Sequence, residues 1–384
     1  MILTKQQNSD LTGIQFSSNL YCCAPTMTAL NEIIDPDGDT LIIIPYTTSS
    51  SETTDASETT HSHEGTDTDT VTETRFKVSR NHLTVASRRA KRMFQGEYLE
   101  TQKSEIDGCY HWKFEPIFDP EALGIVLRIM HASNQNLPDN VTLEMLVSIG
   151  KIVDDLQCHE ALSFFVKVWT SRIGQPIPHY MCKSLIQWIF VASVFKFDEY
   201  LRKATRVALM DSTGHIDSLG LPIISDIIDK IEKKRHDLLK DLADQLHSSL
   251  QNLCSGSHCN EPQCTYVMIG GLSKNMNDLK LFSPAPEGAF PNMSLCSAFK
   301  KVRSFDSPPL YIPSKTATQK VPPSPYSSWS QPKENVWVLK EDYRLGQKDE
   351  VKQLKMHQCS LQELLEPKIA YLETQAKHMN LTNV

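Results

Sequence analysis

Two short runs of apolar and β-branched residues, separated by a long polar segment, constrain the fold of this chain most strongly. Residues 40–44 (TLIII) follow the turn-forming residues 36–38 (PDG), and residues 75–78 (RFKV) resume the β-type pattern. The first run is apolar at every position after Thr40, which is typical of a strand buried on both faces. The sequence therefore predicts two hairpin strands joined by a very long loop.

The segment between the two runs has almost no apolar residues. Residues 47–74 are nearly all Thr, Ser, Glu, Asp and His, and they include no Lys or Arg. A segment of this composition cannot bury enough apolar surface to offset its chain entropy. We expect residues 47–74 to be a disordered insertion, and the polar residues 1–30 to be a disordered N-terminal tail.

After the second run, the pattern alternates between helix and strand signals. A helix is predicted from a cap at Ser79 or Asn81 to Gly96, followed by a third strand at residues 110–115 (YHWKFE). Residues 119–121 (DPE) are typical of a helix start, and two more helices are predicted between residues 142 and 169. Residues 31–170 are thus predicted to form an α+β domain, a small β-sheet flanked by helices.

From residue 175 onward the pattern is helical. We expect an all-α extension over residues 175–282, including a long helix that begins near Pro222. The apolar stripe of that helix is interrupted by Arg235, so it favours packing within the domain, although a coiled coil is the alternative. A Pro/Ser-rich linker is predicted over residues 283–335, and a partly helical segment over residues 336–384.

The loop that follows the long helix contains four potential metal ligands, Cys254, His258, Cys259 and Cys264. Thiolates and imidazole are the ligands that zinc prefers, so one hypothesis is a small zinc site at residues 254–264. The spacing is not that of paired C-x₂-C arms, and the alternative hypothesis is a linking loop with incidental thiols. Zinc is the only cofactor that the sequence suggests.

Composition and missing motifs exclude several classes of function. The formal net charge of -7 and the pI of about 6.0 do not favour binding to nucleic acid. We see no signal peptide and no run of about 20 apolar residues, so we expect an intracellular protein of the nucleus or cytoplasm without a membrane span. No phosphate-binding loop, nucleophile elbow or H-E-x-x-H motif is present, so we name no catalytic residues and expect a protein that is not an enzyme.

The region from Asp37 to about Trp169 resembles a BTB/POZ domain, in particular the divergent BTB proteins of filamentous fungi. The order strand, strand, helix, strand and then a string of helices matches that architecture. The likeness is carried by residues 38–43 (GDTLII), 119–123 (DPEAL) and 149–160 (IGKIVDDLQCHE), and by residues 76–87 (FKVSRNHLTVAS), which are similar to the signature F-x-x-H-[KR]-x-x-L-x-x-x-S. Ser79 replaces the usual His, Ala90 replaces an aromatic residue, and the insertion is longer than usual.

The resemblance implies a protein-interaction module. In that family the fold forms homodimers through its first helix and N-terminal elements, or docks onto cullin-3 as a substrate adaptor of a ubiquitin ligase. Asp39 and Arg80 match a charged pair near the dimer groove of some members, although an ordinary strand-end acid and surface arginine are the alternative. A transcriptional or scaffold regulator, with or without the zinc site, is the second functional hypothesis.

Overall fold

The computed structural model describes residues 29–47, 71–174, 176–222, 224–256, 258–282, 290–313 and 354–378. The chain divides into two compact units, residues 1–174 and 175–384. This division coincides with the predicted boundary between the α+β domain and the helical extension. The described part of the chain has mixed α+β structure, with eleven α-helices and one small four-stranded sheet.

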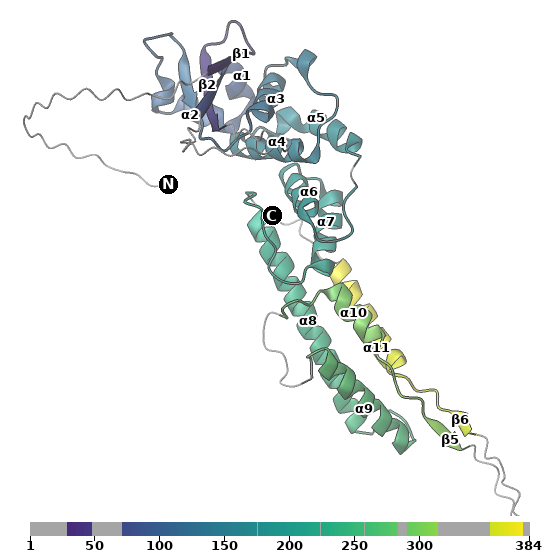
Figure 1. Ribbon diagram of the computed structural model, residues 1–384. Helices are drawn as coiled ribbons and strands as arrows, with labels where there is room; N and C mark the ends of the chain where they lie inside the picture. The colour runs from purple at the N-terminus through teal and green to yellow at the C-terminus, as the bar shows by residue number, and fades with distance from the viewer. Residues whose placement is uncertain are drawn as a thin grey trace, which may run out of the picture. The chain divides into compact units, whose positions relative to one another are not determined.

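The first unit is built around that sheet (Figure 1). Its strands are β1 (Ala29–Ile33), β2 (Thr40–Thr47), β3 (Val71–Val78) and β4 (Tyr110–Lys113), in the spatial order β1-β3-β2-β4. The β2 and β3 strands form the expected antiparallel pair, while β1 lies parallel to β3 and β4 lies parallel to β2. The consecutive residues Ile42, Ile43 and Ile44 are all buried, which agrees with a strand covered on both faces.

The hairpin strands are longer than the sequence predicted. Thr47 pairs with Val71, so both ends of the predicted insertion at residues 47–74 belong to the sheet. Val71, Thr72 and Thr74 are β-branched and favour extended backbone, which the polar composition of the segment obscured. The predicted N-terminal tail at residues 1–30 was too long, because Ala29 and Leu30 belong to β1 and pair with β3. Residues 1–28 and 48–70 lie outside the described residues.

The helices of the first unit follow the predicted order, with one correction. They are α1 (Arg80–Ala86), α2 (Arg88–Gln95), α3 (Pro120–Met130), α4 (Leu143–Leu156) and α5 (His159–Arg172), with 3₁₀ turns η1 (Leu99–Thr101) and η2 (Asn134–Asn136). The single helix predicted up to Gly96 is two helices, because Ser87 adopts an extended conformation between them. Its hydroxyl accepts a hydrogen bond from Ala90 N and so caps α2, while donating to Leu156 O at 2.6 Å.

The second unit is helical apart from one two-stranded ribbon. Its elements are α6 (Lys183–Val194), α7 (Asp198–Asp211), α8 (Ile224–Cys254), α9 (Pro262–Asp278), α10 (Leu295–Arg303), β5 (Tyr311–Pro313), β6 (Leu354–Met356) and α11 (Leu361–Lys377). The α9 and α11 helices pack against α8, as Figure 1 shows. The apolar stripe of α8 is buried within this unit, which agrees with packing rather than a coiled coil.

Arg235 lies on the buried stripe of α8, yet its side chain has polar partners. Its Nη1 donates to Met293 O at 3.0 Å and to Phe290 O at 3.4 Å. The guanidinium therefore joins α8 to the segment that leads into α10. Arg235 interrupts the apolar pattern of the sequence, but in the structure it forms hydrogen bonds that connect two segments.

One further prediction needs correction in the C-terminal part of the chain. The predicted linker at residues 283–335 contains α10, which is capped by Ser294 and buries Leu295, Ala298, Phe299 and Val302. The prolines of this range dominate its composition, but they do not fall within residues 295–303. The predicted partly helical segment at residues 336–384 contains α11, which continues through Pro367.

No helix among the described residues combines the length and the apolar character that crossing a bilayer requires.

Candidate functional site

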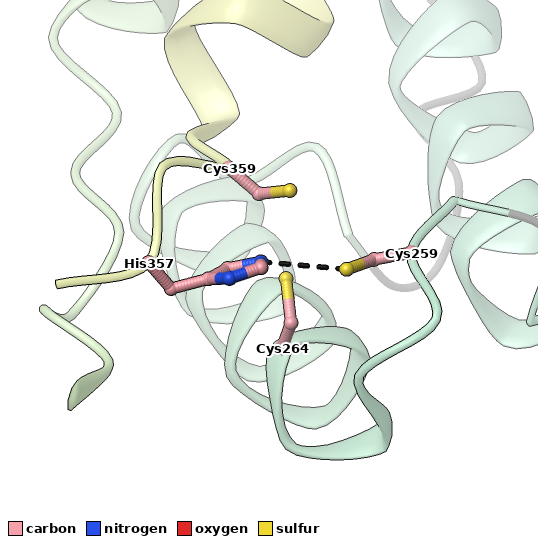
Figure 2. Close-up of side chains that lie close together, drawn as sticks. All are labelled: Cys259, Cys264, His357 and Cys359. Carbon is pink, nitrogen blue, oxygen red and sulfur yellow. Dashed lines mark hydrogen bonds between the residues drawn. The ribbon is translucent and has the colours of Figure 1, made fainter. Parts of the chain in front are cut away.

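Three cysteines and one histidine meet in the second unit (Figure 2). Cys259 lies in the loop between α8 and α9, and Cys264 lies in the first turn of α9. His357 and Cys359 come from the short segment between β6 and α11. The four side chains point toward one another in Figure 2, although they come from two distant parts of the sequence.

The ligand atoms of this Cys/His cluster are close enough to share one ion. The three sulfur atoms and the imidazole nitrogen of His357 all lie within 4.8 Å of one another. The Sγ atom of Cys259 lies 3.4 Å from Nε2 of His357, and the backbone N–H of Glu261 donates to that sulfur at 3.5 Å. The backbone of His357 is held by a hydrogen bond from its N–H to Leu310 O at 2.8 Å.

Burial and the neighbouring thiols disfavour the thiolate forms of Cys264 and Cys359. Burial raises the pKa of Cys264 to about 12, and the neighbouring thiols of Cys359 and Cys259 add to the effect. Burial likewise raises the pKa of Cys359 above its ordinary value. Neutral thiols are weak hydrogen-bonding groups, whereas thiolates are strong ligands for a soft cation.

The structure brings together only two of the four ligands predicted from the sequence. Cys259 and Cys264 belong to the cluster, but Cys254 is exposed at the end of α8 and His258 is exposed in the following loop. His357 and Cys359 were not predicted, because His357 lies 98 residues after Cys259 and spacing within one loop does not indicate so distant a ligand. The signal that could have found them is the pair H-x-C directly before Ser360, which caps α11.

A hollow of about 760 Å³ borders the cluster. Cys264, His357 and Cys359 form part of its wall, and the remainder comes from residues 305–310, from residues 356–360 and from both α9 and α11. The cluster thus lies at the edge of a depression between the starts of two helices.

A second group of possible ligands, Asp35, His82 and His131, lies in the first unit. Both ring nitrogens of His131 already form hydrogen bonds within the first unit. Its Nδ1 bonds to Leu127 O at 2.8 Å, and its Nε2 accepts a hydrogen bond from Ser79 N at 2.9 Å. Because both nitrogens have partners, His131 has no lone pair available for a metal, and we assign this group a structural role.

The predicted charged pair Asp39 and Arg80 is in contact in the first unit. Asp39 Oδ1 accepts a hydrogen bond from the backbone N–H of Arg80 at 2.8 Å, and Oδ2 lies 3.9 Å from the Nε of Arg80. The Arg80 guanidinium also stacks 4.6 Å from the centre of the Tyr110 ring. The side chain of Ser79 does not cap α1, so Asp39, the residue directly before β2, performs this task.

Comparisons of the chain with family models, with curated proteins and with solved structures give no match in any of the three. The function therefore has to be inferred from this chain's own residues.

Proposed function

We propose that this chain is a non-enzymatic protein–protein interaction protein whose first unit is a BTB/POZ-type module that self-associates. The observation that supports it is the order of the elements around the sheet. A β2–β3 hairpin leads to the helices α1 and α2, then β4 returns beside β2, and α3, α4 and α5 follow. This is the order of strands and helices on which the resemblance to BTB domains depends.

The positions of the signature residues support the same proposal. Phe76, Leu83 and Ser87 are each at most 1% exposed. Phe76 and Leu83 belong to the apolar core, and Ser87 joins α2 to the end of α4 through its hydrogen bond to Leu156. Such residues would be retained by a fold of this kind because replacing any of them leaves a cavity or an unpaired buried group.

The surface that we assign to self-association contains β1 and α1. These correspond to the N-terminal elements and the first helix through which the resemblance implies that the domain forms dimers. Ile33 on β1 is 66% exposed, and Val85 on α1 is 89% exposed. The β1 strand is also an edge of the sheet, with one side unpaired among the described strands. The occupant that we propose for this surface is a second copy of the chain, with the Asp39–Arg80 contact at the start of α1 beside it.

Sedimentation velocity on the full chain tests the proposal. We expect a dimer, and we expect Val85→Asp and Ile33→Asp each to weaken it at least about tenfold, because both place a charge in an apolar interface. Ile106→Asp is the matched control, since Ile106 is 95% exposed in the loop before β4 and lies outside this surface. A chain that remains monomeric at its highest soluble concentration, or a control that disrupts the dimer equally, would contradict self-association.

An assay for binding partners distinguishes a substrate adaptor from a transcriptional or scaffold regulator. Affinity capture of the full chain from its native host, followed by mass spectrometry, tests whether cullin-3 is recovered. Recovery of cullin-3 supports the substrate-adaptor role, and its absence from a capture that recovers other partners favours a transcriptional or scaffold role.

A further inference from the structure

We propose that Cys259, Cys264, His357 and Cys359 bind one zinc ion, which fastens the start of α11 to the start of α9. This site is in the second unit and does not depend on the function proposed for the first. It differs from the site predicted from the sequence, because two of its ligands come from the C-terminal segment.

The ligand set determines which cation fits. Three thiolates and one imidazole make a closed Cys₃His site, which is a standard set for structural zinc and provides no carboxylate or carbonyl oxygen for calcium or magnesium. With four protein ligands the tetrahedral coordination is complete, so we assign the ion a structural role rather than a catalytic one. Binding exchanges the three thiol protons for Zn²⁺, and His357 coordinates through a lone pair without losing a proton.

The geometry needs little adjustment to hold the ion. Zn–S and Zn–N bonds of ordinary length in a tetrahedron separate the ligand atoms by about 3.6–3.8 Å. The Cys259 Sγ to His357 Nε2 distance is 3.4 Å, and no pair of ligand atoms in the cluster is more than 4.8 Å apart. Movements of about 1 Å in side chains would therefore close the site, and rotamer changes of this size are normal on binding.

Two contacts of the cluster favour the thiolate form and oppose the effect of burial. The backbone N–H of Glu261 donates to the Cys259 sulfur, as outer hydrogen bonds to metal-bound thiolates commonly do. Cys264 lies in the first turn of α9, a helix of 17 residues, where the helix dipole favours negative charge. These contacts offset part of the net negative charge of three thiolates around one Zn²⁺.

The consequence of the site is a connection between distant segments. Cys259 and His357 are 98 residues apart in sequence, and the ion would close this long loop. It would hold His357 and Cys359 directly before Ser360, the residue that caps α11. The start of α11 would then be fixed from one side by the ion and from the other by Leu361 N, which donates to Ser307 Oγ at 2.9 Å.

Metal analysis of the purified full chain tests the site. The chain is prepared with a reductant and without a chelator, and zinc is measured by mass spectrometry of the elements. We expect about one zinc per chain, and we expect Cys359→Ser and His357→Gln each to lower the content at least about fivefold. The matched controls are Cys254→Ser and His258→Gln, which replace the two residues outside the cluster and should retain the ion.

Cobalt substitution distinguishes a variant that has lost a metal ligand from a variant that has lost its fold. Cobalt(II) added to the metal-free chain should give the visible bands of a tetrahedral site with thiolate charge transfer. The His357→Cys variant keeps four ligands, so it should retain binding and strengthen the charge-transfer bands relative to the original chain.

Three outcomes would overturn the proposal. One is a zinc content below about a tenth of an equivalent together with no tetrahedral cobalt spectrum. Another is a site that depends on Cys254 and His258 but not on His357 and Cys359. The third is a disulfide between Cys264 and Cys359 in chain that has been kept under reductant, since that bond would consume two of the ligands.

Discussion

The Sγ atom of Cys259 lies 3.4 Å from Nε2 of His357, although 98 residues separate them in the sequence. The contact joins the loop before α9 to the segment before α11, and Cys264 and Cys359 complete the group. Its immediate consequence concerns α11, because the segment that leads into this helix would be held by the proposed ion.

Removal of the metal should loosen α11 without unfolding it. The helix also buries Leu361, Leu365, Ile369 and Leu372, and Arg303 binds both Glu366 and Glu373, so other contacts remain. We expect a chelator to raise the rate of tryptic cleavage at Lys368 by about tenfold, measured by mass spectrometry of the fragments. The Cys359→Ser variant should show the raised rate already and should not respond to the chelator. Equal cleavage with and without the chelator would argue that the cluster does not hold α11.

Two cysteines outside the cluster should differ strongly in reactivity. Burial raises the pKa of Cys158 to about 12, and its side chain is 1% exposed, whereas Cys254 is exposed. The raised pKa keeps Cys158 in its thiol form at pH 7, whereas the thiolate is the reactive form. We expect iodoacetamide to label Cys254 rapidly and Cys158 hardly at all, as measured by peptide mass spectrometry. In urea the two rates should converge; similar rates in the native chain would contradict the burial of Cys158.

The stability of the first unit should fall on mild acidification because of His131. Burial lowers the pKa of His131, and the nearby His82 ring adds to the effect, while Asp35 acts in the opposite direction. The unfolded chain therefore takes up this proton first, beginning near pH 6.5. The contribution of His131 is complete above about pH 6.5 and declines as the pH falls toward the lowered pKa of the folded state.

Urea unfolding at pH 7.0 and at about pH 5 measures this dependence. In the His131→Leu variant the difference in unfolding free energy between the two pH values should shrink, although the variant is less stable at both. A variant with the same pH dependence as the original chain would show that another group is responsible.

Ser87→Ala should destabilise the first unit by about 1–3 kcal/mol, because it removes the cap of α2 and leaves Leu156 O without its buried partner. Ser163→Ala is the matched control, since Ser163 is exposed on α5 and donates only to Glu160 O of its own helix. We expect the control to change stability by less than about 0.5 kcal/mol, as judged from urea midpoints. Equal losses for the two variants would mean that Ser87 has no special role.

Arg235→Met should destabilise the second unit by about 1.5–3 kcal/mol. Methionine preserves the apolar stem on the buried stripe of α8, but it removes the charged donor to Met293 O and Phe290 O. Lys233→Met on the exposed side of the same helix is the control and should have little effect on the urea midpoint. A gain in stability from Arg235→Met would show that the apolar stripe outweighs the hydrogen bonds.

Local sequence signals predicted most of the order of elements. The turn at residues 36–38, the β-type runs on either side of the insertion, the Asp119 cap and the Thr142 cap all mark elements that the structure contains. The sequence likewise predicted the boundary between the two units near residue 170 and the helical character of the second unit. These features depend on residues close together in the chain, where propensity, capping and periodicity act directly.

The break at Ser87 and the role of Arg235 could not be predicted in this way. Ser87 ends α1 because its hydroxyl serves α2 and Leu156 together, and Leu156 is 69 residues away. Arg235 interrupts an apolar pattern, and its partners lie 55 and 58 residues further along. In both cases the deciding contact is a hydrogen bond between segments that only the fold brings together.

The Cys/His cluster shows the same division. The sequence alone determined that thiols gather around the loop after α8, and it named Cys259 and Cys264 among four candidate ligands. Only the tertiary structure decided that their companions are His357 and Cys359 rather than Cys254 and His258. Coordination depends on the distances between ligand atoms in space. The packing of α9 and α11 on α8 sets those distances, and the spacing of residues along the chain does not encode them.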